Sequence, residues 1–166
     1  MVAGRSGDDN ERMFTTSLRD HPPIPIDPPG AGPVIVGFDG SPAAARALDL
    51  AAEALAPDGL LLVVSIEPQV QSRGLLSESL LEPGVSAEVL LDFARERLRG
   101  AAPSLELETI ARTGDPGDAL VELARERDAR LIAVGGRGAD YNARVLLGSV
   151  AAHVAEHAPC DVLVVR

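Results

Sequence analysis

Three glycines and a serine near the end of the chain have a spacing that suits the binding of a phosphate group. Gly135 and Gly138 form a G-x-x-G pair, and after nine intervening residues Gly148 and Ser149 follow. A backbone without side chains lets N–H groups approach an anion closely, and the unpaired N–H groups and dipole of a helix start add to the attraction. The pattern therefore predicts a phosphate-binding loop. An ordinary surface loop with a helix cap at Ser149 is the alternative.

A strand and a helix flank this loop in the predicted structure. The run Arg-Leu-Ile-Ala-Val over 130–134 is typical of a short buried strand. Residues 149–156 follow a helical pattern, for which Ser149 is the predicted N-cap. A glycine-rich turn between a strand and a helix is the setting in which backbone groups bind phosphate.

The glycine spacing resembles the G-2x-G-9x-G-(S/T) signature of the universal stress protein family, and specifically of its ATP-binding branch. The similarity extends over about residues 32–166 and includes the stretches VIVGFDGSP at 34–42, GDP at 114–116 and HAPCDVLVV at 157–165. The sequence departs from the family in having Ala129-Arg130 where Ala-Asp is frequent. This position lies outside the glycine motif.

The resemblance implies a role for each of the matching polar positions. Gly135, Gly138, Gly148 and Ser149 match the positions that bind the phosphates. Asp39 matches an aspartate that accepts hydrogen bonds from the ribose hydroxyls or the adenine amino group. From the sequence alone, Asp39 could equally serve only to stabilise the Asp-Gly-Ser-Pro turn.

Apolar and basic residues complete the predicted site. Ile66, Val134 and Val150 match positions that line the adenine and ribose pocket of the family, although each is also an ordinary core residue. Arg137 and Arg144 lie within the loop and could add positive charge near a triphosphate, whereas loop arginines are more often simply solvated.

The composition excludes several functional classes. The formal net charge of −10 argues against binding to nucleic acids or anionic membranes, both of which reward clustered positive charge. Every basic residue except histidine is arginine, so a Walker A loop, a protein kinase and Schiff-base chemistry all lack their lysine. No Ser/His/Asp arrangement or paired carboxylates stand out, and we predict no catalytic residues.

Histidine and cysteine offer little further chemistry. His153 and His157 are four residues apart, as two metal ligands on a helix would be, but no convincing third ligand accompanies them and we predict no metal site. Cys160 is the only cysteine, and we expect an inert thiol and no disulfide. With no apparent secretory signal and no run of transmembrane length, the sequence predicts a cytoplasmic protein.

Hydrophobic patterns predict five strands alternating with four helices. The strands are expected at 33–39, 60–66, 105–111, 130–135 and 161–166, and the helices at 43–56, 86–98, 117–127 and 149–156. Alternation of this kind implies one doubly wound parallel α/β sheet with helices on both faces. The family resemblance implies the strand order 3-2-1-4-5. Ligands of such sheets bind at the switch point between strands one and four, which end at Asp39 and Gly135.

The rest of the chain divides into an arm and a domain. Residues 1–31 are polar and end in a proline-rich stretch, so we predict a disordered arm, with a docking ligand as the alternative to a plain linker, before a domain over 32–166. The connection 67–84 is predicted to contain one short helical turn over 75–81. In the helix over 86–98, the pattern predicts one inward side made of Val89, Leu90, Phe93 and Leu98.

With the family resemblance, these observations predict an ATP-binding universal stress protein that acts as a regulatory or protective module. Mg²⁺ could bind together with the ATP. Two alternatives stay open, namely a slow Mg-dependent ATP hydrolase and a structural dimer that binds no nucleotide. AMP or cyclic AMP could replace ATP as the natural ligand. We expect a homodimer that forms through residues 161–166, an apolar last strand without lysine or proline, and an unidentified protein partner.

Overall fold

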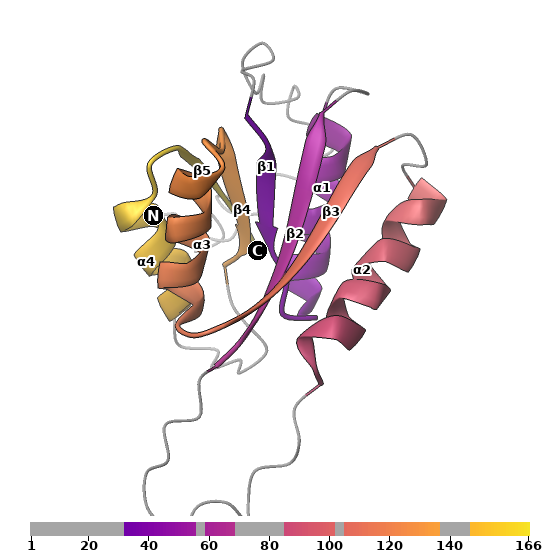
Figure 1. Ribbon diagram of the computed structural model, residues 1–166, viewed down its shortest axis with the longest axis horizontal. Coiled ribbons are helices and arrows are strands. Elements are labelled where there is room, and N and C mark those ends of the chain that lie inside the picture. Colours follow the sequence, from indigo (N-terminus) through magenta and orange to yellow (C-terminus); the bar gives the residue numbers. More distant parts are fainter. Residues whose placement is uncertain (1–31, 56–58, 69–84, 102–104, 137–146) are drawn as a thin grey trace, which may run out of the picture.

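The computed structural model describes residues 32–55, 59–68, 85–101, 105–136 and 147–166. The arm predicted over 1–31 and the helical turn predicted over 75–81 lie outside these ranges. Strands and helices alternate along the described chain (Figure 1). In order they are β1 (Val34–Gly37), α1 (Pro42–Ala54), β2 (Leu60–Glu67), α2 (Ala87–Ala101), β3 (Glu106–Thr113), α3 (Pro116–Glu126), β4 (Leu131–Gly135), α4 (Ser149–His157) and β5 (Asp161–Val165).

The strands form one parallel sheet in the order β3-β2-β1-β4-β5. Val34 of β1 is in register with Leu61 of β2 on one side and with Leu131 of β4 on the other. Helices α1 and α2 cover one face of the sheet, and α3 and α4 cover the other. The predicted fold class and strand order are confirmed. All strands end at the same edge, which we call the carboxyl edge.

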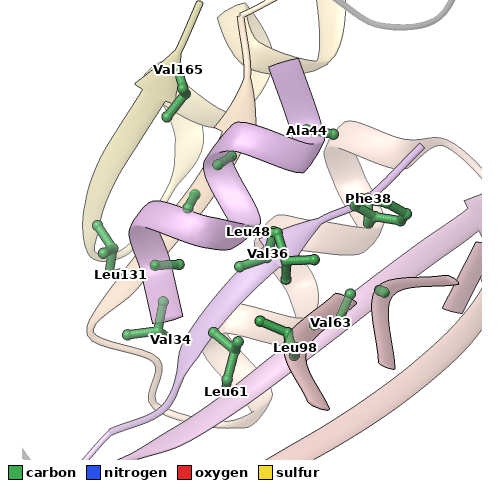
Figure 2. Packing of buried hydrophobic residues seen from close by; sticks show 14 of the residues in the cluster. Val34, Val36, Phe38, Ala44, Leu48, Leu61, Val63, Leu98, Leu131 and Val165 are labelled. Atoms are coloured by element: carbon green, nitrogen blue, oxygen red, sulfur yellow. The ribbon is translucent and has the colours of Figure 1, made fainter. Parts of the chain in front are cut away.

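Alternation along β1 divides the core into two clusters, one on each face of the sheet. Val34 and Val36 point toward α1 and α2, where they join Leu48 and Leu98 in the cluster shown in Figure 2. Ile35 belongs to the cluster beneath α3 and α4. Both faces of the central strands are therefore buried, which explains their continuous apolar sequences.

The start of two helices follows from a polar cap followed by proline. The Ser41 Oγ accepts a hydrogen bond from the Ala44 N–H (3.2 Å), and Pro42 is the first residue of α1. Asp115 caps α3 in the same way, before Pro116. Proline fits the first helical position because its missing N–H would have no intrahelical partner there. The pairs Ser41-Pro42 and Asp115-Pro116 are typical of such helix starts and can be recognised in the sequence.

The predicted inward face of α2 is wrong for two of its four residues. Val89 and Phe93 are 57 % and 56 % exposed, and Leu90 is half-buried. The buried residues of this helix are Ala87, Leu91, Ala94 and Leu98, of which only Leu98 was predicted. The prediction favoured the large side chains, whereas the sheet accepts two alanines because α2 packs closely on β2 and β3.

Within the described residues no helix is long and apolar enough to span a membrane.

Candidate functional site

The turn after β1 places Asp39 at the carboxyl edge. The backbone of Phe38 still donates to the Val64 carbonyl (2.8 Å), and the chain then turns through Gly40 at φ +78°. Asp39 is exposed, and its Oδ1 accepts a hydrogen bond from the Ser41 N–H (2.9 Å). Asp39 therefore does stabilise this turn, as one of its two predicted roles requires. Its ligand-binding role stays a prediction.

Gly135 ends β4 directly against the start of α1. A Cβ atom on Gly135 would lie 2.9 Å from the backbone nitrogen of Ala44 and 3.0 Å from the Cβ of Ala43. The first of these atoms belongs to the backbone and cannot easily move aside, so glycine is required for this packing. The contact brings the end of β4 to the helix that follows the Asp39 turn. The two turns meet at the switch point, as predicted from the parallel topology.

Gly136 joins the glycine loop to the last strand. Its N–H donates to the carbonyl of Val165 (2.6 Å), and its own carbonyl accepts from the Gly148 N–H (2.7 Å). The second bond closes the loop 137–147 at its base. Gly138, Arg137 and Arg144 lie outside the described residues, so their predicted roles stay predictions. Sequence reasoning missed Gly136, for which the doubled glycine at 135 and 136 was the available signal.

The start of α4 differs from the prediction. The N-cap of this helix is Gly148, not Ser149, and no side chain of the described residues makes a capping hydrogen bond there. Ser149 is the first helical residue and is exposed. The helix begins one residue earlier than a cap at Ser149 would place it, because the Gly136 bond holds Gly148 in an extended conformation (φ −67°, ψ 159°). The hydroxyl of Ser149 is therefore not used as an N-cap.

The absence of a side-chain cap leaves donors at this helix start. The first N–H groups of any α-helix have no partner within the helix, and together with the dipole they favour an anion. In α4 these are the N–H groups of Ser149, Val150 and Ala151, and within the described residues the N-cap makes no side-chain hydrogen bond to them. The arrangement can bind a phosphate group.

The predicted apolar contacts all belong to one cluster. Val134, which is 3 % exposed, lies in the core beneath α3 and α4, and Ile66 and Val150 pack against it as half-buried residues. The structure thus brings these three residues to one face of the sheet. Ile66 precedes the last residue of β2 and Val150 lies in the first turn of α4, so both are near the carboxyl edge.

The two histidines of α4 make structural contacts. Their rings stack with centroids 4.3 Å apart, and the Nδ1 of His157 lies 2.9 Å from the carbonyl oxygen of His153. The Nε2 of His153 lies 2.9 Å from an Asp118 carboxylate oxygen and so links α4 to α3. Within the described residues no group of three or more His, Cys, Asp or Glu side chains could hold a metal ion.

Cys160 lies half-buried before β5. Burial, and secondly the nearby charge of Asp161, raise the pKa of its thiol. A raised pKa lowers the fraction of reactive thiolate at neutral pH.

Comparison with known proteins gives a consistent family match. The model of the universal stress protein family matches residues 31–166. The chain is 41 % identical over 141 residues to the universal stress protein Rv1636 of Mycobacterium tuberculosis, an alignment that covers 80 % of this chain and 94 % of that protein.

Two solved structures with bound nucleotides share the fold. One is a universal stress protein in complex with cAMP, which is 33 % identical with a TM-score of 0.59, over 81 % of this chain and 96 % of that one. The other is the universal stress protein of Archaeoglobus fulgidus in complex with dAMP, which is 26 % identical with a TM-score of 0.57, over 81 % and 98 % of the two chains.

Proposed function

Because this chain belongs to the universal stress protein family, we propose that it binds ATP and acts as a regulatory or protective module in a stress response. The observation that carries the proposal is the start of α4. Among the described residues it has no side-chain cap, and the Gly136–Gly148 hydrogen bond holds it at the carboxyl edge beside the end of β4. An anion bound there would take the place of the missing cap.

The proposed binding mode assigns one task to each part of the site. Backbone N–H groups around Gly135, Gly138 and Gly148, with the hydroxyl of Ser149, bind the phosphates. Asp39 accepts hydrogen bonds from the ribose or the adenine. The apolar residues Ile66, Val134 and Val150 support the sugar and base from the cluster beneath α3 and α4.

An adenine nucleotide is supported by the relatives that carry cAMP and dAMP. ATP in particular is favoured by the complete G-2x-G-9x-G-S spacing, which provides a long loop for several phosphates. Any Mg²⁺ would then be held mainly by the phosphates, because the described residues include no cluster of metal ligands. We place this role in the cytoplasm, a reducing compartment that suits a chain with a single cysteine.

The nucleotide content of the purified protein tests this proposal directly. The protein is denatured, and the released small molecules are identified by chromatography. Calorimetry with ATP, ADP, AMP and cAMP then ranks the ligands, with Ser149→Ala as the matched variant that keeps the fold. We expect ATP to be released or to bind most tightly. If no adenine nucleotide is released and none produces binding heat, the proposal is wrong.

We also propose a homodimer that forms through β5. The two edges of the sheet differ in their protection: on β3, Glu108 pairs with Arg127 (2.6 Å) and Arg112 with Glu126 (2.5 Å), so charged side chains cover that edge. The hydrogen bond from Arg127 lowers the pKa of Glu108. On β5, Val162, Leu163 and Val164 are half-buried, and among the described residues no ion pair involves any residue of this strand, Asp161 included.

An apolar strand edge without charged cover is a surface that pairs readily with another strand. Light scattering at tens of micromolar should therefore give twice the 17.3 kDa mass of the chain. A monomer at that concentration would contradict the dimer and leave the nucleotide proposal untouched.

A further inference from the structure

The large apolar side chains that are more than half exposed in the described part of the chain lie along a single stripe. Val85, just before α2, is 62 % exposed, and Val89 and Phe93 on α2 are 57 % and 56 % exposed. They are spaced four residues apart, so they follow one side of the helix. This side is opposite to the one that buries Ala87, Leu91, Ala94 and Leu98 in the core. We call these three residues the α2 stripe.

The α2 stripe is rigidly attached to the domain. The ring of Phe93 stacks on that of Phe38, with centroids 6.3 Å apart, and Phe38 itself is only 3 % exposed. Leu90, on the flank of the stripe, packs against the core and touches the turn at Gly40, where an added Cβ would lie 2.8 Å from its Cδ2. A rigid apolar surface of this kind favours a partner because burying it removes apolar area from water.

The chain itself returns to the stripe through the connection between β2 and α2. Figure 1 shows that β2 ends and α2 begins at the same edge of the sheet. The Oε1 of Glu67 at the end of β2 accepts a hydrogen bond from the Ala87 N–H (2.8 Å). The two ends of the connection are thus fixed within the reach of one side chain, and its last residues run directly into Val85.

The connection contains a segment that is apolar enough to cover the α2 stripe. Residues 75–81 read Leu-Leu-Ser-Glu-Ser-Leu-Leu, with four leucines in one short segment. Tethering at both ends gives the segment a high effective concentration at the stripe, so only a small loss of chain entropy opposes its packing there. We infer that residues 75–81 pack their leucines on the α2 stripe and cover it within the same chain.

Two other occupants fit the arrangement less well. A second copy that pairs through β5 would lie beside the outermost strand on the side of the sheet away from α2. Helix α2 packs on β2 and β3, and the strand order is β3-β2-β1-β4-β5. Such a dimer would leave the stripe uncovered. The N-terminal arm enters the fold at Gly32, next to the carbonyl of Asp128. Gly32 precedes the start of β1, so it lies at the end of the sheet opposite to the carboxyl edge, near which Val85 lies (Figure 1).

Nuclear magnetic resonance of the unaltered full chain provides the primary test. Nuclear Overhauser effects are measured between leucine methyl groups and the ring of Phe93. We expect cross-peaks from leucines of residues 75–81, and in a mixture of labelled and unlabelled chains these should arise within one chain. If no such cross-peaks are found, or if contacts to Phe93 arise only between chains, the inference is overturned.

Disulfide formation supplies a quantitative second test. In a Cys160→Ser background, the pair Leu80→Cys and Val89→Cys is compared with the pair Leu80→Cys and Glu88→Cys. Glu88 is equally close to the tether but lies off the stripe. We expect the intrachain disulfide to form at least about tenfold faster for the Val89 pair in native buffer, and at equal rates in guanidinium. Equal rates in native buffer would contradict the packing.

Discussion

The helices of this protein begin in two different ways, and the difference separates structure from function. At α1 and α3 a side chain satisfies the first N–H groups: Ser41 binds the Ala44 N–H, and Asp115 binds the Gly117 N–H (2.8 Å). At α4 the capping position is glycine and offers no acceptor. The first two starts are complete within the chain. The third has no side-chain cap within the described residues, so its first N–H groups can donate to an external acceptor such as water or an anion.

The neighbouring glycines fit this distinction. Gly135 has no space for a side chain because the backbone of α1 lies against it, so glycine at this position serves packing. A substitution at Gly135 would therefore disturb the fold together with any ligand site. Gly138 is the better test of the phosphate loop, since its predicted role is close approach to the ligand alone.

The largest effect is expected for Gly138→Val. A branched side chain would block the approach of the backbone to the phosphates, and ATP binding measured by calorimetry should be lost or fall severely. Circular dichroism should show a folded protein. Gly100→Val is the matched control, because a Cβ at Gly100 meets nothing within 4 Å. Unchanged ATP affinity in the Gly138 variant would place the phosphates elsewhere.

Ser149→Ala should have the next largest effect on affinity. It removes one hydroxyl that we expect to bind a charged oxygen, an interaction worth about 1.5–3 kcal/mol. ATP affinity should fall roughly ten- to a hundredfold. The melting temperature without nucleotide should hardly change, because this side chain makes no capping bond. A loss of stability with unaltered affinity would show that Ser149 has only a structural role.

Asp115→Ala should show the reverse behaviour. Its carboxylate holds the N–H groups of Gly117 (2.8 Å) and Asp118 (3.1 Å), and the loss of such a cap costs about 0.5–2 kcal/mol. The free energy of unfolding in urea should decrease by this amount, while ATP affinity should stay the same. If ATP affinity fell as strongly as in Ser149→Ala, the division between structural and ligand-binding helix starts would not hold.

The sequence was sufficient for the features that depend on local chemistry or on continuous apolar runs. Ser41-Pro42 and Asp115-Pro116 marked two helix starts correctly, because cap and proline act within a few residues. Buried strands such as β2 are apolar throughout, and their alternation with helices determines a parallel sheet. The order of the strands came from the family resemblance.

Features that depend on long-range contacts could not be read in the same way. The hydrogen bond between Gly136 and Gly148 joins residues on opposite sides of a loop, and it moved the cap of α4 from Ser149 to Gly148. The inward face of α2 was set by how closely the helix approaches the sheet, which favoured Ala87 and Ala94 over Phe93. In both cases a contact with a distant part of the chain outweighed the local preference, for a serine cap at α4 and for large inward side chains at α2.

Gly148→Ser should produce the smallest change in stability and the sharpest test of the comparison. It gives α4 the kind of cap that α1 already has, and the extended conformation of Gly148 (φ −67°) is open to serine. A serine cap should stabilise the free protein by a few tenths of a kcal/mol over glycine. The new hydroxyl would occupy an N–H that we assign to a phosphate, so ATP affinity should decrease. Urea unfolding and calorimetry measure the two effects, and Gly100→Ser on α2 controls for the added hydroxyl. If stability and ATP affinity rose together, the start of α4 would not be the phosphate site.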